Sequence, residues 1–304
     1  MPIPPASTEA GAAIRGIALM TAAFGLFACL DTTAKWLGRT MESGDIAFLR
    51  YATHVILLAL VWRIWSNTEC LRTSRPIAQI VRGLFLLGST FFNFWALQHL
   101  QLAEAAAIMF AGPLVVTALA GPVLGEKVGI RRWAAVLVGF VGVLIVMRPG
   151  TGAMHWAAGL SVCAMCSYVG YALMTRKLHQ TESSEALLMI SAMVGALGLS
   201  PFAVSAVESL QGWQWALAFM MGFFGAVGHY ALVLAHRMSS ASVLAPFVYT
   251  QIVWMILFGF IIFGDIPDVW TVVGTSIIVS AGIYILHRER VRGRPVASNI
   301  PTKL

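Results

Sequence analysis

Residues 102–150 read LAEAAAIMFAGPLVVTALAGPVLGEKVGIRRWAAVLVGFVGVLIVMRPG. The stretch contains two long apolar runs, 102–123 and 132–149, and three of its six charged residues, Glu126, Lys127 and Arg131, lie in the short segment between them. A helix rises about 1.5 Å per residue, so about 20 apolar residues cross the roughly 30 Å hydrocarbon core of a bilayer. The stretch therefore predicts two membrane-crossing helices joined by a short polar loop that contains Gly125 and Glu126.

Apolar runs of the same kind fill the rest of the chain. Hydrophobic residues make up 59% of the 304 residues and charged residues only 11%, whereas a soluble domain carries about 25% charged residues. This composition excludes a soluble or disordered protein, and a content of four cysteines excludes a secreted disulfide scaffold. The sequence predicts an all-α membrane protein with ten transmembrane helices, at 14–36, 45–65, 80–99, 102–123, 132–149, 156–175, 186–206, 213–235, 241–263 and 269–287.

The basic residues indicate how the chain is oriented. Cytoplasmic loops of membrane proteins are enriched in Lys and Arg. With the N-terminus in the cytoplasm, most basic residues, Arg82 among them, fall on the cytoplasmic side, and Lys35, Arg39 and Arg148 fall on the other side. We therefore expect a bacterial inner-membrane protein with both termini cytoplasmic. The net charge of +7 then reflects topology and lipid headgroups, not a nucleic-acid partner.

The two halves of the chain share sequence features at corresponding positions. Gly125-Glu126 follows the fourth predicted span, and Gly264-Asp265 follows the ninth. Each half has five spans, an odd number, so the halves cross the membrane in opposite directions and form an inverted repeat. Such repeats are typical of secondary transporters, whose solute site lies near mid-membrane between the halves. The expected organisation is a tail 1–13, a first repeat 14–149, a second repeat 156–287 and a basic tail 288–304.

Residues 102–150 and the run SASVLAPFVYTQIVWMILFGFIIFGDIPDVWTVVGTSIIVSAGIYIL (240–286) resemble the two copies of the EamA branch of the drug/metabolite transporter superfamily. The resemblance covers about residues 14–288. It implies that spans one to four and six to nine line a central cavity, that spans five and ten lie at the periphery, and that the protein works by alternating access. The second copy has Asp265 where the family usually has Glu, and it has no counterpart of Pro113.

Two charged residues in the first span are candidate solute contacts. The segment LFACLDTTAKWL (26–37) is similar to riboflavin and S-adenosylmethionine carriers and related metabolite exporters of this family. It carries Asp31 and Lys35, which are four residues apart and share a helix face. The two side chains can therefore pair. They either lie near the outer membrane interface and extend toward the headgroups, or line the outer entrance of the cavity and bind a charged or zwitterionic solute.

Arg50 and His54 repeat this spacing in the second span. Arg50 follows Asp45 and precedes a long apolar run. Its guanidinium either forms a fixed ion pair with Asp31 or Asp45, or it attracts a carboxylate or phosphate of the solute. Both roles are compatible with different states of one transport cycle.

Polar and aromatic side chains within the later spans form a second candidate group. Each alone contributes about 0.6 kcal/mol if it simply bonds a neighbouring helix. Together they come from spans expected to meet at the centre, and polar atoms that face lipid are costly. We expect them to line a cavity for a planar or aromatic metabolite. The group comprises Asn93, Trp95, Tyr168, Tyr171, His229, Tyr230, Tyr249 and Gln251.

Six further residues have expected structural or gating roles. Glu104 either balances the helix dipole at the start of its span or takes up a proton for coupling. Glu126 and Asp265 are expected to hold the start of the next helix or nearby basic side chains. Pro113, Pro246 and Pro201 lie inside apolar spans, where the missing backbone donor permits bending. The spans that contain Pro113 and Pro246 are candidate gating helices.

The sequence lacks the motifs that are typical of enzymes. Phosphate-binding loops and catalytic constellations are absent from the sequence, and the Cys163–Cys166 spacing lies in an apolar helix without a second ligand pair. We therefore expect no enzyme activity, no cofactor and no metal. A non-transporting membrane assembly protein and a lipid-acting membrane enzyme are the alternatives from other classes.

The predicted function is secondary-active transport of a small polar or aromatic metabolite, such as an amino acid, a vitamin or a nucleoside-like compound. Export is the first hypothesis, and import of a riboflavin- or S-adenosylmethionine-like metabolite is the alternative. A proton or a counter-solute is the candidate driving partner. Both a monomer and a homodimer in the lipid bilayer fit the sequence.

Overall fold

The computed structural model describes residues 6–63, 68–124, 130–150, 155–178, 181–239 and 241–291, and every regular element within these ranges is helical. The α-helices are α1 (Ala6–Leu37), α2 (Ser43–Val61), α3 (Pro76–Leu97), α4 (Leu102–Met109), α5 (Gly112–Leu124), α6 (Ile130–Met147), α7 (Ala157–Leu178), α8 (Ser184–Gly198), α9 (Ala203–Ser209), α10 (Gln214–Met238), α11 (Ala241–Leu244), α12 (Thr250–Phe258) and α13 (Val269–Val291). Tighter turns form η1 (Glu69–Leu71), η2 (Ser200–Phe202) and η3 (Ala245–Tyr249), and a π-helical turn forms η4 (Gly259–Phe263).

Most of the predicted spans are long apolar helices. Within the described residues, seven helical segments are long and apolar enough to cross a membrane. An eighth segment is a pair of helices, Ser184–Gly198 and Ser200–Ser209, that meet at an angle of 57°. Two shorter apolar helices, Trp133–Met147 and Val269–Ile285, overlap the predicted fifth and tenth spans. The protein is therefore an all-helical, multi-pass membrane protein.

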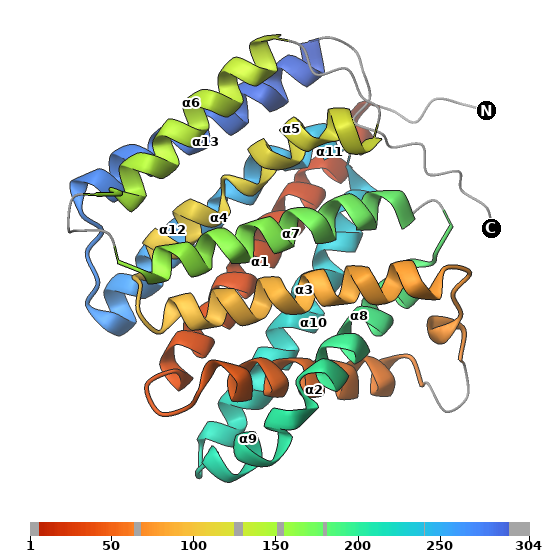
Figure 1. Cartoon of the computed structure of the whole chain (residues 1–304). Coiled ribbons are helices and arrows are strands. Elements are labelled where there is room, and N and C mark those ends of the chain that lie inside the picture. The colour runs from red at the N-terminus through yellow and green to blue at the C-terminus, as the bar shows by residue number, and fades with distance from the viewer. Residues whose placement is uncertain are drawn as a thin grey trace, which may run out of the picture.

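Helices of the two halves pack against each other in related pairs (Figure 1). α1 packs along α10, and α3 packs along α7. These two pairs are equivalent when spans are counted within each half, because α7 is the counterpart of α1 and α10 is the counterpart of α3. α2 packs on its own counterpart α8, α4 on α12, and α6 on α13. The contacts thus fit a two-repeat architecture, with α6 and α13 side by side at one edge.

Three apolar spans are interrupted, each close to a proline. α4 stops before Pro113, at the start of α5, and η3, which contains Pro246, precedes α12. Pro201 lies in η2, at the bend between α8 and α9. Proline removes a backbone donor, and its ring clashes with the carbonyl four residues earlier, so a regular helix does not continue through it. The helices are thus interrupted close to all three prolines that the sequence marked for bending.

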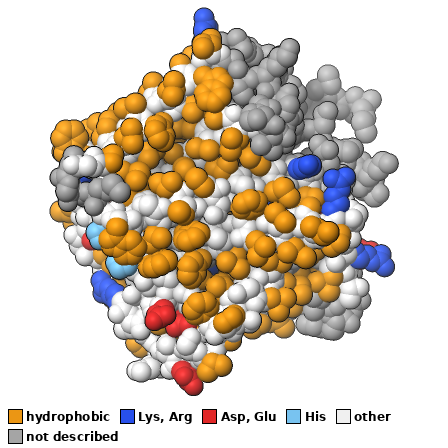
Figure 2. Space-filling view, in the orientation of Figure 1, with side chains coloured by type: hydrophobic (Ala, Val, Ile, Leu, Met, Phe, Trp, Pro, Cys, Tyr) orange, Lys and Arg blue, Asp and Glu red, His pale blue; other side chains and the backbone are white. Residues whose placement is uncertain are grey.

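The outer surface of the bundle is apolar. Figure 2 shows hydrophobic side chains over the face that α3, α6 and α7 present, with the visible Lys and Arg side chains at its edges. Large apolar residues such as Leu137, Phe140 and Val272 have about half or more of their surface exposed. In water such a surface would drive aggregation, whereas in a bilayer it faces lipid.

The connections between helices gather at two ends of the bundle (Figure 1). We call the end where α1 begins and α13 finishes the proximal end, and the opposite end the distal end. The proximal end carries residues 68–75 and 181–183, and the distal end carries residues 38–42, 98–101, 148–150, 210–213 and 264–268.

Candidate functional site

A carboxylate lies between the two repeats. Asn93 of α3 donates a hydrogen bond from Nδ2 to Oδ1 of Asp31 in α1 at 3.1 Å, and Gln251 of α12 donates from Nε2 to Oδ2 at 3.4 Å. α1 and α3 belong to the first half of the chain and α12 to the second, so Asp31 connects the halves. A carboxylate offers about four acceptor positions, and these amides use two of them. The remaining capacity suits a cationic or hydrogen-bond-donating group.

A small cavity with a partly polar lining lies among α2, α3, α7 and α8, and one of its lining residues, Arg50, interacts electrostatically with Asp31. The cavity encloses a volume of about 10 Å³, which is room for roughly one water molecule. Its polar lining includes Arg50, His54 and Ser191, whose exposed fractions are 6%, 4% and 1%. Within the described part of the chain, Arg50 Nε and Nη1, His54 Nε2 and Ser191 Oγ have no hydrogen-bond partner. Such unsatisfied groups are uncommon in protein interiors because each loses its bonds to water.

The surroundings of Arg50 differ from the fixed ion pair that the sequence offered as one alternative. Among the described residues, no carboxylate lies within 4 Å of its guanidinium. Asp45 instead accepts a hydrogen bond from Ser205 Oγ at 2.6 Å, and Asp31 attracts Arg50 from a longer distance. The guanidinium stacks 4.6 Å from the centre of the Tyr51 ring, and the Tyr51 hydroxyl bonds to Thr90 at 2.9 Å. The cation is therefore held in place on one face and left without a direct anionic partner.

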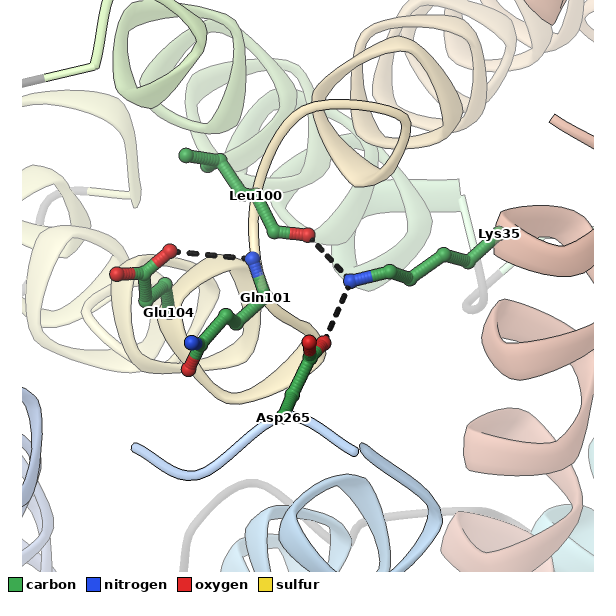
Figure 3. Close-up of polar contacts among 5 residues, drawn as sticks. All are labelled: Lys35, Leu100, Gln101, Glu104 and Asp265. Atoms are coloured by element: carbon green, nitrogen blue, oxygen red, sulfur yellow. Dashed lines mark hydrogen bonds and ion pairs between the residues drawn. The ribbon is translucent and has the colours of Figure 1, made fainter. Parts of the chain in front are cut away.

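Lys35 points away from Asp31 and toward the distal end, so the two do not pair. Its Nζ donates to Asp265 Oδ2 at 2.8 Å and to the Leu100 carbonyl at 2.8 Å (Figure 3). Asp265 follows Gly264, which has a φ of 73° and turns the chain between η4 and α13. The sequence assigned Asp265 to the next helix or to nearby basic residues, whereas the structure pairs it with the first repeat. We call Lys35, the Leu100 carbonyl and Asp265 the distal clasp.

Aromatic rings cover the distal clasp. The Arg39 guanidinium stacks 4.4 Å from the centre of the Trp36 ring and 5.1 Å from that of Phe263, and Lys35 Nζ lies 4.9 Å from the Phe263 centre. Trp36 also contacts Trp213, at the start of α10, with ring centroids 6.5 Å apart. Cation–π contacts of this kind each contribute about 0.5–2 kcal/mol. Together they close the distal end between the two repeats.

The proximal end is bridged by Glu182. Its carboxylate accepts hydrogen bonds from Ser74 N at 3.1 Å, from Ser74 Oγ at 2.6 Å and from Gln79 Nε2 at 3.3 Å. Burial opposes ionisation of Glu182, but the hydrogen bonds from Ser74, Thr73 and Gln79 outweigh it and lower the pKa of the carboxyl below its ordinary value. Glu182 precedes α8 and Ser74 precedes α3, so this proximal clasp also joins the two repeats.

Arg82 is buried, not placed in a loop as its charge suggested. Only 1% of its surface is exposed, and its guanidinium donates to Thr175 Oγ1 at 3.0 Å and to the Leu187 carbonyl. It also stacks 5.0 Å from the centre of the Tyr171 ring. These partners lie on α7 and α8, so Arg82 fastens α3 to the second half.

Two of the predicted ring side chains reach the small cavity or its lining, and a third is buried in the bundle. Tyr171 lines the small cavity, and His229 stacks on His54 with ring centroids 6.0 Å apart. Tyr249 is buried against Phe110, at a centroid separation of 5.5 Å.

Three other predicted residues face outward. Trp95, Tyr168 and Tyr230 have 37%, 39% and 60% of their surface exposed. Trp95 packs edge-on against Trp156, away from Asp31. Consecutive residues on a helix are rotated by about 100°, so the inward position of His229 turns its neighbour Tyr230 to the exterior.

The remaining predicted residues lie outside the polar centre. Glu104 accepts a hydrogen bond from the Gln101 backbone N–H at 3.1 Å, which satisfies one of the free donors at the start of α4. This contact agrees with the helix-start alternative for Glu104. Pro113 is the second residue of α5, and Pro246 lies in η3. Glu126 lies outside the described residues.

Sequence reasoning did not select Ser191, and it noted His54 only for its spacing. Ser191 is one hydroxyl in an apolar helix, and hydroxyls there usually bond to their own backbone, so nothing in the sequence set it apart. The spacing of Arg50 and His54 was the available signal, because residues four apart in a helix face the same neighbours.

Comparison with known proteins agrees with this arrangement of two repeats. The model of the EamA-like transporter family matches residues 14–148 and again residues 155–287. A solved crystal structure that is 16% identical superposes with a TM-score of 0.61, covering 91% of this chain and 98% of its own, which shows a shared fold.

Curated relatives span nearly the whole chain. A protein of Rickettsia felis named as an S-adenosylmethionine uptake transporter is 30% identical over 86% of this chain and 88% of its own length. A riboflavin transporter of Rhizobium johnstonii is 28% identical over 96% and 97% of the two chains, and a pseudopaline exporter of Pseudomonas aeruginosa is 25% identical over 90% and 97%. Two family matches in tandem, together with transporters as full-length relatives, establish that the chain belongs to the EamA-like transporter family and is a transporter of small metabolites, not an enzyme.

Proposed function

We propose that the protein carries a small zwitterionic metabolite of the S-adenosylmethionine type across the bacterial inner membrane by alternating access. The observation that carries the proposal is the Asp31 carboxylate, which is held by Asn93 from one repeat and Gln251 from the other. A solute that binds Asp31 contacts both repeats at once. Its binding energy is therefore coupled to their relative movement.

The proposed topology has ten crossings in two inverted repeats, 14–149 and 156–287, with both termini in the cytoplasm. The symmetry-related helix pairs support the repeats, and the distribution of basic residues supports the orientation. On this topology the distal end faces the periplasm and the proximal end faces the cytoplasm. The bent span made by α8 and α9 counts as one crossing.

Uptake is the proposed direction of transport, whereas the sequence alone favoured export. The relative that is 30% identical is named for uptake of S-adenosylmethionine, a metabolite that carries a sulfonium and an ammonium group. Both cations suit a carboxylate with free acceptor positions. Export is the second candidate, and the resemblance to the pseudopaline exporter favours it.

In the proposed cycle the distal clasp and the proximal clasp open in turn. Opening toward the periplasm breaks the contacts of Lys35 with Asp265 and Leu100, while Glu182 keeps the cytoplasmic side closed. Opening toward the cytoplasm releases Glu182 from Ser74 and restores the distal contacts. The solute at Asp31 is then exposed to one side at a time.

The test is transport of radiolabelled S-adenosylmethionine and riboflavin into proteoliposomes that contain the purified protein. We expect accumulation of S-adenosylmethionine that is saturable, with a loss of at least about tenfold in Asp31→Asn, because a charge-assisted bond of roughly 1.5–3 kcal/mol is removed. Glu208→Gln is the matched control, since Glu208 is an exposed carboxylate on α9. Wild-type transport by Asp31→Asn would refute the site, and transport of riboflavin alone would refute the proposed solute.

A further inference from the structure

The small cavity among α2, α3, α7 and α8 contains a buried guanidinium, an imidazole and a serine hydroxyl, all of which can donate hydrogen bonds. Arg50 and His54 come from α2 and Ser191 from α8, so the first and second repeats both contribute. All three are more than nine-tenths buried, and four of their polar atoms have no partner among the described residues. Tyr51 and Tyr171 complete the polar wall, but the Tyr51 hydroxyl is already bonded to Thr90.

This set of free groups favours an anion, because it includes the positively charged guanidinium of Arg50. A guanidinium has five N–H donors and no acceptor, a serine hydroxyl donates one, and a neutral imidazole can donate from Nε2. A carboxylate accepts several such bonds, and bonds between ionised partners are about twice as strong as neutral ones. A water molecule can accept only two bonds, and it leaves the positive charge of Arg50 without an anionic partner, whereas a carboxylate supplies both the acceptor positions and the opposite charge.

We infer that Arg50, His54 and Ser191 form an anion subsite that takes the carboxylate of the transported solute while Asp31 takes its cationic part. The inference rests on the proposed function and narrows the solute to compounds with both charges. Arg50 is already oriented by stacking on Tyr51, which lowers the entropy lost on binding.

The present size of the cavity adds a conformational requirement. About 10 Å³ holds one water molecule, so a carboxylate enters only when the wall of the cavity moves. α8 supplies Leu188, Ser191 and Ala192 to that wall and is joined to α9 through the 57° bend at η2. Gly195 of α8 packs directly on the Tyr51 ring, so movement of α8 away from α2 widens the subsite while Arg50 stays stacked on Tyr51.

The test compares S-adenosylmethionine with its decarboxylated form, which differs from it only in the carboxylate. Each compound competes with radiolabelled S-adenosylmethionine for binding to the full-length protein in nanodiscs. We expect wild type to prefer the carboxylated compound by about 10- to 100-fold. Arg50→Gln removes this preference with little change in affinity for the decarboxylated compound, Arg50→Lys retains part of it, and Ser191→Ala reduces it a few-fold. Asp31→Asn weakens both compounds. Equal affinity of wild type for the two compounds overturns the subsite.

A second measurement keeps the subsite testable if neither compound binds, a result that would refute the proposed solute. Formate, the smallest carboxylate, should raise the thermal midpoint of wild type relative to chloride at equal ionic strength and should leave Arg50→Gln unaffected. Elution of each variant as a single species in size-exclusion chromatography verifies folding. An equal response of both proteins to formate, or no response in wild type, indicates a cavity that holds only a trapped water and contradicts the inference.

Discussion

Lys35 in α1 and Asp265 ahead of α13 are 230 positions apart in the chain, yet their charged groups lie within 2.8 Å of each other. This ion pair ties the repeats at the distal end, and Glu182 ties them at the proximal end through Ser74. One conformation therefore has both ends bridged. Because alternating access requires each bridge to break in turn, the two bridges should act on the conformational equilibrium in opposite senses.

Asp265→Asn should shift the protein toward the conformation that is open at the distal end. It removes an ion pair whose side chains are 15% and 24% exposed, and a loss of roughly 1 kcal/mol changes the equilibrium about fivefold. The measurement is the rate at which a membrane-impermeant maleimide, added from the periplasmic side, labels Gln251→Cys in a background without the four native cysteines.

Glu182→Ala, which breaks the proximal clasp, should lower the same labelling rate, and Glu208→Gln should leave it unchanged. Faster labelling after breaking either clasp would contradict the opposed roles of the two ends. It would indicate instead that both contacts merely hold the bundle together.

The proximal clasp should make stability depend on pH. Hydrogen bonds lower the pKa of Glu182 in the folded protein, so its contribution is fully present above the ordinary pKa of a Glu side chain, about 4.3, and is lost as the pH falls through the lower folded value. The difference in thermal midpoint between wild type and Glu182→Gln should be constant between neutral pH and about pH 5 and should shrink below about pH 4. A difference that grows on acidification would contradict this assignment.

Gly222 of α10 faces Thr53 of α2 so closely that a Cβ atom would overlap the Thr53 side chain. Gly222→Ala should therefore destabilise the protein by about 1–3 kcal/mol, because the two helices cannot separate without losing other contacts. Gly159 in α7 has open space within 4 Å of the position that a Cβ atom would occupy, and Gly159→Ala should be neutral or stabilising by up to about 1 kcal/mol. Thermal denaturation of both variants in the same detergent provides the comparison.

The proposed topology places Gly150 and Leu210 on the periplasmic side. Alkaline phosphatase fused after either residue should be active, whereas green fluorescent protein fused there should not fluoresce. A fusion after Leu71 should give the reverse pattern, because η1 lies at the proximal end. Cytoplasmic reporter behaviour after either Gly150 or Leu210 would refute the number of crossings.

Hydropathy is sufficient to predict an all-helical membrane protein, because crossing a bilayer requires long apolar helices whatever their partners are. Interruptions within a helical span are harder to predict from the sequence. Pro113, Pro246 and Pro201 marked three of them, but the π-helical turn at Gly259–Phe263 follows an apolar run without a proline. It depends on how the end of α12 meets the loop that carries Asp265.

The sequence did not indicate which side chains of the site bind one another. Asp31, Asn93 and Gln251 were selected for their polarity, and they meet because α1, α3 and α12 converge. Lys35 had an equally good local partner in Asp31, one helical turn away, and only the tertiary fold brings Asp265 closer. Arg82 had the charge pattern of a loop residue, and only its carbonyl and hydroxyl partners on neighbouring helices explain its burial.

Closure of both ends in a single conformation protects the membrane that contains the protein. A passage open to both compartments at once would conduct protons and potassium ions and would dissipate the voltage that drives other cellular work. Because Lys35–Asp265 and Glu182–Ser74 are formed together, one mouth can seal before the other unseals. Each turnover then moves its cargo without a transient leak.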